Sequence, residues 1–458
     1  MTRIGPITFV LLLAGAVLPA GAQEAAPNLG GGLTYTGAPT PQEILALQKA
    51  CEARKPPRKG GGMLSELTYK RMERILVAVG KNEYADSELK LQELSENARG
   101  EYEKAVVEQT LAFVYAVQNK YGKAIAAYEK ALATNALPQQ AHEQLMFNVA
   151  QMYMSENRFD KGEQMLLRYM QESCYPVAEA HISLGIIYAD RKQFRESLKQ
   201  TDLALVKSKT PKETWLQLKL ALHFELKEMP RCAEVLVHLI ALAPLKETYF
   251  KQLHGVLSEI KKDQEAMAVL ALAERRGFVD EEREYVNLSN MYLFMEIPLK
   301  AAQVLERGFA AKKIEPTDKN LEKLANAWFA ARENDEAEKA MARAAQASDK
   351  GELWKQLATI QIEKENWKGA LESLRKAQQK GGLKAAGEVD YLIGVAATQA
   401  KQWKTAEAAL RAAMQHEKFV KQATEWLNHM REEQAYFAPA NGNGNGNAPA
   451  EPAGDAKS

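Results

Sequence analysis

The chain has 458 residues, of which 46% are hydrophobic and 26% are charged, and its 60 basic side chains nearly balance its 59 acidic ones. This composition excludes a wholly disordered or collagen-like chain. The formal net charge of +1 argues against a nucleic-acid-binding protein, because binding to phosphates needs a clustered excess of cations. Three cysteines are too few for a disulfide framework.

Residues 1–22 have the pattern of a secretory signal peptide. Arg3 provides the positive start, residues 7–17 form an apolar stretch, and residues 20–22 (Ala-Gly-Ala) form a small-residue cleavage site. The apolar stretch is shorter than the roughly 20 residues that cross a bilayer, although an uncleaved membrane anchor is the alternative interpretation. We therefore expect cleavage after Ala22 and export, which places the mature protein in a periplasm.

Glycine and proline are frequent in residues 23–62, which predicts a flexible N-terminal tether with room for a short helix over residues 42–53. The basic cluster within residues 49–59 is either a solvated surface or a contact for anionic lipid or peptidoglycan. The second interpretation would give the protein a peripheral association with the membrane. At the other end, residues 438–458 contain alternating Asn and Gly and are expected to be disordered.

One unit recurs along the middle of the chain. Each copy has a large residue next to a small one, an aromatic or apolar residue further along and, after a turn, a second small residue. The first small position recurs every 33 to 38 residues, at 112, 150, 185, 221, 254, 289, 325, 358 and 394. This period is close to the roughly 34 residues of the tetratricopeptide (TPR) repeat, a hairpin of helices A and B. The predicted fold class is therefore all-α, a right-handed superhelical solenoid of about nine to ten TPR repeats.

The repeat pattern also predicts the domain boundaries. The solenoid is expected over residues 63–418, with a degenerate first repeat at residues 67–94 and a C-terminal capping helix at residues 419–437. One hairpin cannot bury its apolar face alone, so the stacking of hairpins must supply the core.

The small positions have a steric role in this interpretation. Ala112 and Gly394 are expected where helix A crosses helix B of the same repeat, because only a small side chain permits close approach. His254 stands at one of the small positions, which predicts a loosely packed fifth repeat.

No catalytic or metal-binding motif is present in the sequence. The seven histidines form no HExxH and no i, i+4 pair, and there is no P-loop, no GxSxG elbow and no dinucleotide-binding GxGxxG. We therefore expect no enzyme activity, no metal site and no cofactor. A bond between Cys174 and Cys232 would have to span more than one repeat, so free thiols or an intermolecular bond through Cys51 are expected.

The A helices of such a solenoid form its concave face, which is the expected surface for protein partners. The candidate residues at inward positions are Phe113, Gln151, Ile186, Leu222, Asn290, Phe294, Asn326 and Phe329. They either form a groove for an amphipathic helix or an extended peptide, or they pack against neighbouring repeats. No lysine lies four residues before Asn290 or Asn326, so a lysine–asparagine clamp for a peptide carboxylate is not expected.

Several short motifs accompany the repeats. They are Leu64-Ser65 with Tyr69, Tyr102-Glu103-x-Ala105 with Gln109, Ala150-Gln151-x-Tyr153, Pro298-x-Lys300-Ala301-Ala302 with Leu305-Glu306 and Gly308, and Trp426-Leu427. Through these motifs, residues 63–430 resemble a family of secreted TPR proteins encoded beside the TonB–ExbB–ExbD energy-transduction genes of Gram-negative bacteria. The resemblance implies a non-catalytic periplasmic scaffold that assists proton-motive-force-driven uptake of iron complexes or other outer-membrane substrates.

Two other functions fit the same repeats. One is a periplasmic coordinator of envelope assembly, which would contact cell-wall synthases or outer-membrane machinery through the same concave face. The other is a module of a system that exports polysaccharide or protein. In each case the partners are proteins, with no nucleic acid and no small-molecule cofactor.

Overall fold

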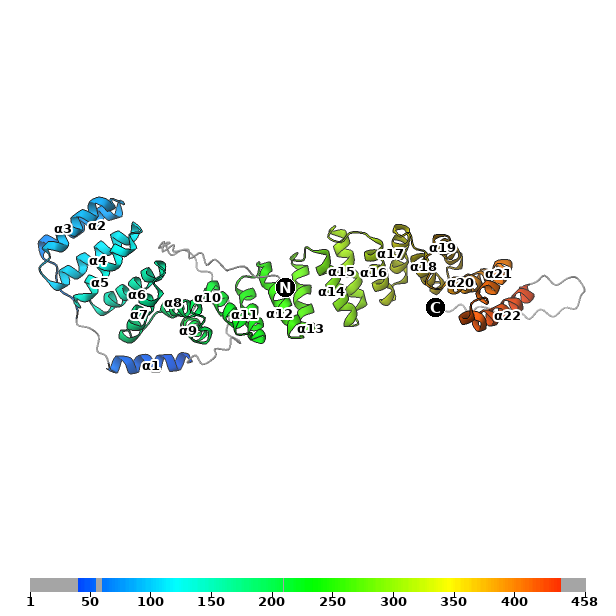
Figure 1. The fold of residues 1–458 in the computed structure, drawn as a ribbon, viewed down its shortest axis with the longest axis horizontal. Coiled ribbons are helices and arrows are strands. Elements are labelled where there is room, and N and C mark those ends of the chain that lie inside the picture. The colour runs from blue at the N-terminus through cyan, green and yellow to red at the C-terminus, as the bar shows by residue number, and fades with distance from the viewer. Residues whose placement is uncertain (1–39, 55–59, 209, 438–458) are drawn as a thin grey trace, which may run out of the picture. The chain divides into compact units, whose positions relative to one another are not determined.

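The computed structural model describes residues 40–54, 60–208 and 210–437, which form helices and no strand. The predicted signal peptide (residues 1–22) and tail (residues 438–458) lie outside the described residues. The described part of the chain contains 22 α-helices, and from α2 onward they follow one another as hairpins (Figure 1). The prediction of an all-α TPR solenoid is confirmed.

The helices belong to two compact units that divide between Lys262 and Asp263. Unit 1 contains α1 (Pro41–Arg54), α2 (Glu66–Gly80), α3 (Tyr84–Asn97), α4 (Glu101–Val117), α5 (Tyr121–Ala133), α6 (Gln139–Ser155), α7 (Phe159–Glu172), α8 (Ala178–Asp190), α9 (Phe194–Lys207), α10 (Glu213–Glu225), α11 (Met229–Leu242) and α12 (Glu247–Glu259). Unit 2 contains α13 (Asp263–Arg275), α14 (Glu282–Phe294), α15 (Pro298–Ala310), α16 (Asp318–Ala330), α17 (Asn334–Ala347), α18 (Gly351–Glu363), α19 (Trp367–Lys380), α20 (Ala386–Gln399), α21 (Trp403–Ala413), a 3₁₀ turn (Glu417–Phe419) and α22 (Val420–Phe437). The division falls inside the predicted fifth repeat, where His254 of α12 replaces the small residue.

Each hairpin turns at a residue in the left-handed backbone region. These residues are Asn82, Asn119, Asn157, Lys192, Lys227, Lys261, Glu296, Arg332, Glu365 and Lys401, with φ between 56° and 64°. In the turn from α4 to α5, the amide of Asn119 donates to the Ala116 carbonyl and the amide of Lys120 donates to the Tyr115 carbonyl, both at 2.9 Å. These two bonds satisfy carbonyls at the end of helix A, as in a Schellman cap. Nine of these turns join two helices of one unit into a hairpin, beginning with the degenerate first repeat, α2 with α3, and the turn at Lys261 lies where the two units divide.

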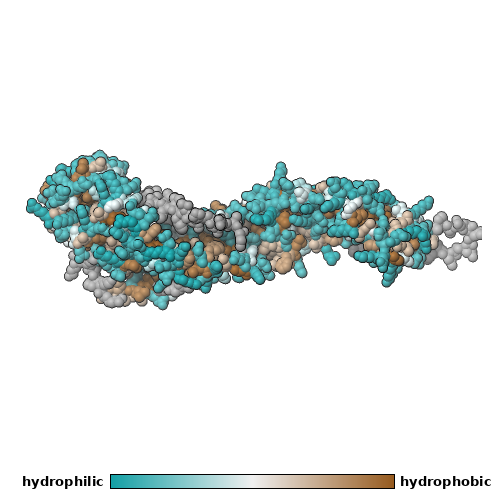
Figure 2. Space-filling view, in the orientation of Figure 1, coloured by the Kyte–Doolittle hydropathy of each residue, from teal (hydrophilic) through white to brown (hydrophobic). Residues whose placement is uncertain are grey.

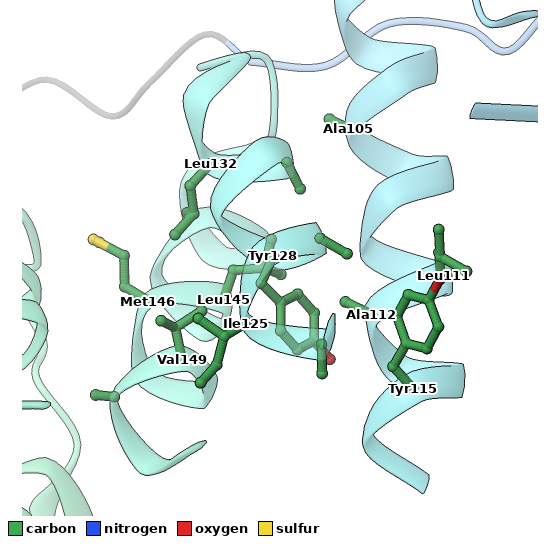
Figure 3. Close-up of a cluster of buried hydrophobic side chains, with 14 of the residues drawn as sticks. Ala105, Leu111, Ala112, Tyr115, Ile125, Tyr128, Leu132, Leu145, Met146 and Val149 are labelled. Carbon is green, nitrogen blue, oxygen red and sulfur yellow. The ribbon is translucent and has the colours of Figure 1, made fainter. Parts of the chain in front are cut away.

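The core runs between successive helices of each unit. In unit 1, Ala112 of α4 is fully buried and faces Tyr128 of α5, which is 4% exposed (Figure 3). Leu145 and Val149 of α6 close the same cluster from the next repeat. The small side chain at position 112 therefore lets α5 approach α4, as the pattern predicts. In unit 2, α22 packs on α20 and α21.

The small positions can be tested with paired glycine variants. A Cβ atom on Gly394 of α20 would lie 2.5 Å from Leu410 Cγ, whereas a Cβ on Gly122 of α5 would meet nothing within 4 Å. We expect Gly394→Ala to destabilise unit 2 by about 1 kcal/mol, because the overpacking cost exceeds the gain in helix propensity. Gly122→Ala should instead stabilise unit 1 by roughly 0.5 kcal/mol. Urea unfolding of each variant measures both, and equal effects would contradict the steric role.

The N-terminal segment departs from the predicted tether. Residues 41–54 form α1, in agreement with the short helix that the sequence predicts, and Cys51 forms a disulfide with Cys174. The expectation of free thiols or an intermolecular bond through Cys51 is therefore wrong, and Cys232 is the free cysteine, buried in α11. The pairing joins residues 123 positions apart. A free tether would not be held against unit 1 in this way.

Among the described helices, none is both long enough and apolar enough to cross a bilayer. The face seen in Figure 2 is mostly hydrophilic, with small separate hydrophobic patches. Single exposed apolar residues are normal on protein surfaces.

Candidate functional site

The candidates in unit 1 lie at equivalent positions on the A helices of four successive repeats. Phe113 of α4 is 48% exposed, while Gln151 of α6 and Ile186 of α8 are partly buried. Leu222 of α10 is only 2% exposed. The exposure of these positions therefore falls along the chain, from a surface aromatic residue to a core residue.

Leu222 belongs to an internal apolar cluster and not to an accessible groove. It packs with Leu198 and Leu218, and Ile186 and Leu226 contact the same cluster from its edge. Leu222 therefore packs against neighbouring repeats in this structure, which is the alternative that the sequence left open for this position. Phe113 is the candidate of unit 1 whose side chain is most open to solvent.

The candidates in unit 2 lie on two neighbouring A helices. Asn290 and Phe294 of α14 are both exposed, and the Phe294 side chain is 77% exposed. Asn326 of α16 is exposed at the position equivalent to Asn290, and Phe329 is partly buried. Unit 2 thus presents two asparagine amides and one open aromatic ring from equivalent faces of its A helices.

Two further residues share this face, and they are not among the candidates that the repeat pattern predicts. Asn287 and Lys323 are exposed, and each lies three residues before Asn290 or Asn326. Residues three apart on a helix are neighbours on its surface, so this spacing could have identified them. We call Asn287, Asn290, Phe294, Lys323 and Asn326 the A-helix face of unit 2.

Polar side chains link the A helices that continue this unit. Gln356 of α18 donates to Glu322 of α16 at 3.2 Å, and Lys355 of α18 lies 2.8 Å from both Glu352 and Glu388. Burial alone would lower the pKa of Lys355, but hydrogen bonds to the two carboxylates raise it above its ordinary value. The ammonium group therefore stays charged and joins α18 to α20.

This arrangement is suited to binding. In the described part of the chain, no cluster of three or more His, Cys, Asp or Glu side chains is placed to hold a metal ion. The amides of Asn287, Asn290 and Asn326 can each donate and accept hydrogen bonds, and Phe294 offers an apolar ring. Amide groups beside an exposed ring are the features that recognise the backbone and a side chain of a peptide.

Comparison with known proteins finds solved structures of repeat proteins that align with parts of this chain. No family model and no curated protein matches the chain. Among solved structures, a tetratricopeptide repeat protein from Parabacteroides merdae aligns with 65% of this chain and 100% of its own length, at 14% identity and a TM-score of 0.36. The C-terminal part of a TPR repeat-containing protein from Cytophaga hutchinsonii aligns with 61% of this chain and 99% of its own, at 11% identity and a TM-score of 0.27. YrrB, a TPR protein with an unusual peptide-binding site, aligns with 46% of this chain and 98% of its own, at 16% identity and a TM-score of 0.30.

Proposed function

We propose that this chain is a non-catalytic periplasmic scaffold that binds protein partners through its A helices and assists a TonB–ExbB–ExbD-type energy-transduction system. The observation that carries the scaffold function is the exposure of Phe113 and Phe294 at inward positions of their repeats, 48% and 77% respectively. Large aromatic side chains contribute much of the binding free energy in protein interfaces.

The disulfide supports export. Bonds such as Cys51–Cys174 form and persist in oxidising compartments, including the bacterial periplasm, and are rare in the cytosol. This agrees with the leader pattern at the start of the sequence. Release of the protein by osmotic shock, together with the soluble periplasmic proteins, is the result we expect, and its retention in the cytosolic fraction would contradict export.

The TonB association is supported by the sequence motifs, and the structure explains what some of them do. Ser65 caps α2 by accepting from the Thr68 amide, and its hydroxyl donates to Glu103 at 2.7 Å. Hydrogen bonds from Thr68 and Ser65 lower the pKa of Glu103 to about 2, so this carboxylate is ionised at any physiological pH. Two of the motifs therefore join the first repeat to the second, which is a folding role and not a binding role.

The proposed partner surface can be tested by capture from cells. Phe294→Asp should reduce recovery of partner proteins from envelope extracts at least about tenfold, because a charge replaces an aromatic anchor. Leu299→Asp is the matched control, since Leu299 is also exposed (44%) but lies at the start of a B helix, α15. Quantitative mass spectrometry of the captured proteins gives the readout, and circular dichroism checks that both variants stay helical.

The identity of the captured proteins distinguishes the functions. TonB, ExbB or ExbD lost with Phe294→Asp and retained with Leu299→Asp would support the proposal. Recovery of cell-wall synthases or outer-membrane assembly proteins alone would favour a coordinator of envelope assembly. Equal recovery with both variants would show that the A-helix face of unit 2 is not the surface used.

A further inference from the structure

Helix α1 is held against unit 1 at its C-terminal end. The Cys51–Cys174 disulfide links it to the loop between α7 and α8, and the Tyr175 hydroxyl in the same loop donates to the Glu52 carboxylate. In Figure 1, α1 is drawn below α7 and α9, and its Ile44 and Gln48 share a pocket with the α7–α8 loop and the end of α9. Ile44, Gln48 and Cys51 are the partly buried positions of this helix, and their i, i+4, i+7 spacing puts them on one face.

The non-covalent hold on α1 is weak. Its two leucines, Leu45 and Leu47, are 51% and 60% exposed, so the helix buries little apolar surface. Its N-terminus is capped internally, by hydrogen bonds between Thr40 and Glu43. A helix of 14 residues is marginal in water without tertiary packing. The disulfide is therefore the principal restraint that keeps α1 docked.

Beneath α1 lies a cavity of about 510 Å³. Ile44 and Gln48 line one side, and the other side is formed by Pro176 to Glu179, Val206 to Ser208 and Trp215. Lys207 lines it with its ammonium donating to the Pro176 carbonyl at 3.1 Å, and burial lowers the pKa of this lysine. The cavity is already open on one side, and departure of α1 would remove the wall that Ile44 and Gln48 form.

The chain that follows α1 is held at a second point, independent of the disulfide. The Gly61 amide donates to the Ala136 carbonyl at 2.9 Å. A Cβ on Gly60 would lie 2.2 Å from the Leu137 carbonyl oxygen, and a Cβ on Gly62 would lie 3.0 Å from the Tyr102 side chain. Gly60 and Gly61 fix the chain on the α5–α6 loop by backbone contact, and Gly62 packs on Tyr102 of α4. Loss of the disulfide would therefore free α1 and leave this anchor in place.

We propose that α1 is a redox-controlled clasp, which the Cys51–Cys174 bond holds closed over the loops of unit 1 and which a dithiol reductant opens. Both cysteines are partly exposed, so a reductant can reach them. One thiolate of the dithiol attacks a sulfur of the Cys51–Cys174 bond and forms a mixed disulfide, and its second thiol then displaces the remaining protein sulfur. Two electrons and two protons pass to the protein, which leaves two cysteine thiols and an oxidised, cyclised reductant.

The test is hydrogen exchange of the full-length protein before and after treatment with dithiothreitol. We expect the amides of α1 to exchange at least about tenfold faster after reduction, while the amides of α8 and α9 and of Gly61 keep their protection. Acetylation of Lys207 by an amine-reactive ester should rise in parallel, because departure of α1 removes one wall of the cavity. The double variant Cys51→Ser with Cys174→Ser should behave as the reduced protein does, without reductant.

Cys232→Ser is the matched control, because Cys232 is buried and unbonded. It should leave both the oxidised state and the response to reductant unchanged. Retained protection of α1 after reduction would show that non-covalent docking suffices and would overturn the clasp. Loss of protection from hydrogen exchange in α8 and α9 together with α1 would equally overturn the proposal, because the disulfide would then stabilise the whole unit and not α1 alone.

Discussion

Lys219→Met is expected to destabilise unit 1 by about 3–5 kcal/mol, the usual cost of breaking a buried ion pair by removing one partner. Lys219 Nζ of α10 lies 2.7 Å from Asp202 Oδ1 of α9, and the two side chains are 1% and 0% exposed. The pair joins helix B of one repeat to helix A of the next. Without the ammonium group, the Asp202 carboxylate stays buried without its charge partner, and water cannot replace the lost interaction.

Two further variants separate the cost of breaking this buried ion pair from the cost of removing a lysine side chain in general. Lys212→Met removes an ion pair with Glu179 at 3.0 Å that also spans two repeats, but these side chains are 59% and 45% exposed, so its cost should stay below about 1 kcal/mol. The double variant Lys219→Met with Asp202→Leu should recover most of the lost stability, because no charge is left buried. Urea unfolding of unit 1 measures all three. Equal costs for Lys219→Met and Lys212→Met would contradict the prediction.

The repeat architecture was predictable because small residues at a fixed period have one steric purpose. Ala112 and Gly394 are fully buried or crowded where two helices meet, as their spacing predicts. The turns were not predictable in the same way. Lys192, Arg332 and Glu365 adopt the left-handed conformation that usually favours glycine, because the helices on both sides determine the backbone there.

Side-chain exposure was harder to predict than helix position. Phe113 and Leu222 occupy the same place in their repeats, yet their exposures are 48% and 2%. Leu222 is buried because Leu198 and Leu218 cover it, and such neighbours depend on the fit between repeats. The period of the repeat determines which way a residue faces, but not which side chains from neighbouring repeats cover it.

The disulfide and the buried ion pair also could not be predicted from the repeat pattern. Cys51 and Cys174 meet with their Cα atoms 5.5 Å apart because the N-terminal segment folds back on unit 1, and that segment has no repeat to indicate its path. Lys219 lies in a helix where a lysine would ordinarily face water, and its burial depends on the carboxylate of Asp202. Both contacts come from tertiary structure outside the repeat pattern.

Acidification is expected to destabilise unit 1 through His181. This residue of α8 is 8% exposed, and its Nδ1 lies 2.8 Å from Gln200 Oε1. The pKa of His181 is lowered to about 4, mainly by burial; the hydrogen bond with Gln200 opposes this shift, and the positive charge of Lys207 adds a smaller lowering. In the unfolded chain the same ring has a pKa of about 6.5. Between these two pH values the His181 ring binds a proton in the unfolded chain but not in the folded chain. The free energy of unfolding therefore falls as the pH drops from about 6.5 to about 4.

The expected loss from His181 over that window is about 3 kcal/mol, since each pKa unit corresponds to about 1.4 kcal/mol. His223 and His238, also in unit 1, have pKa values lowered mainly by burial and act in the same direction. The proton-binding ring is absent in His181→Gln. The total change in the free energy of unfolding of unit 1 with pH should therefore be smaller in this variant than in the unaltered protein, by about the same 3 kcal/mol. Urea titrations between about pH 7 and pH 4.5 measure this slope.

The matched control is His429→Gln, because the His429 ring of α22 in unit 2 is 46% exposed. The pH dependence of unit 1 in this variant should follow that of the unaltered protein, since the substitution lies in unit 2. A change in overall stability that is the same at every pH would report only the altered packing at position 181. The prediction concerns the slope, and identical slopes in His181→Gln and the unaltered protein would show that burial of this ring does not make unit 1 sensitive to acid.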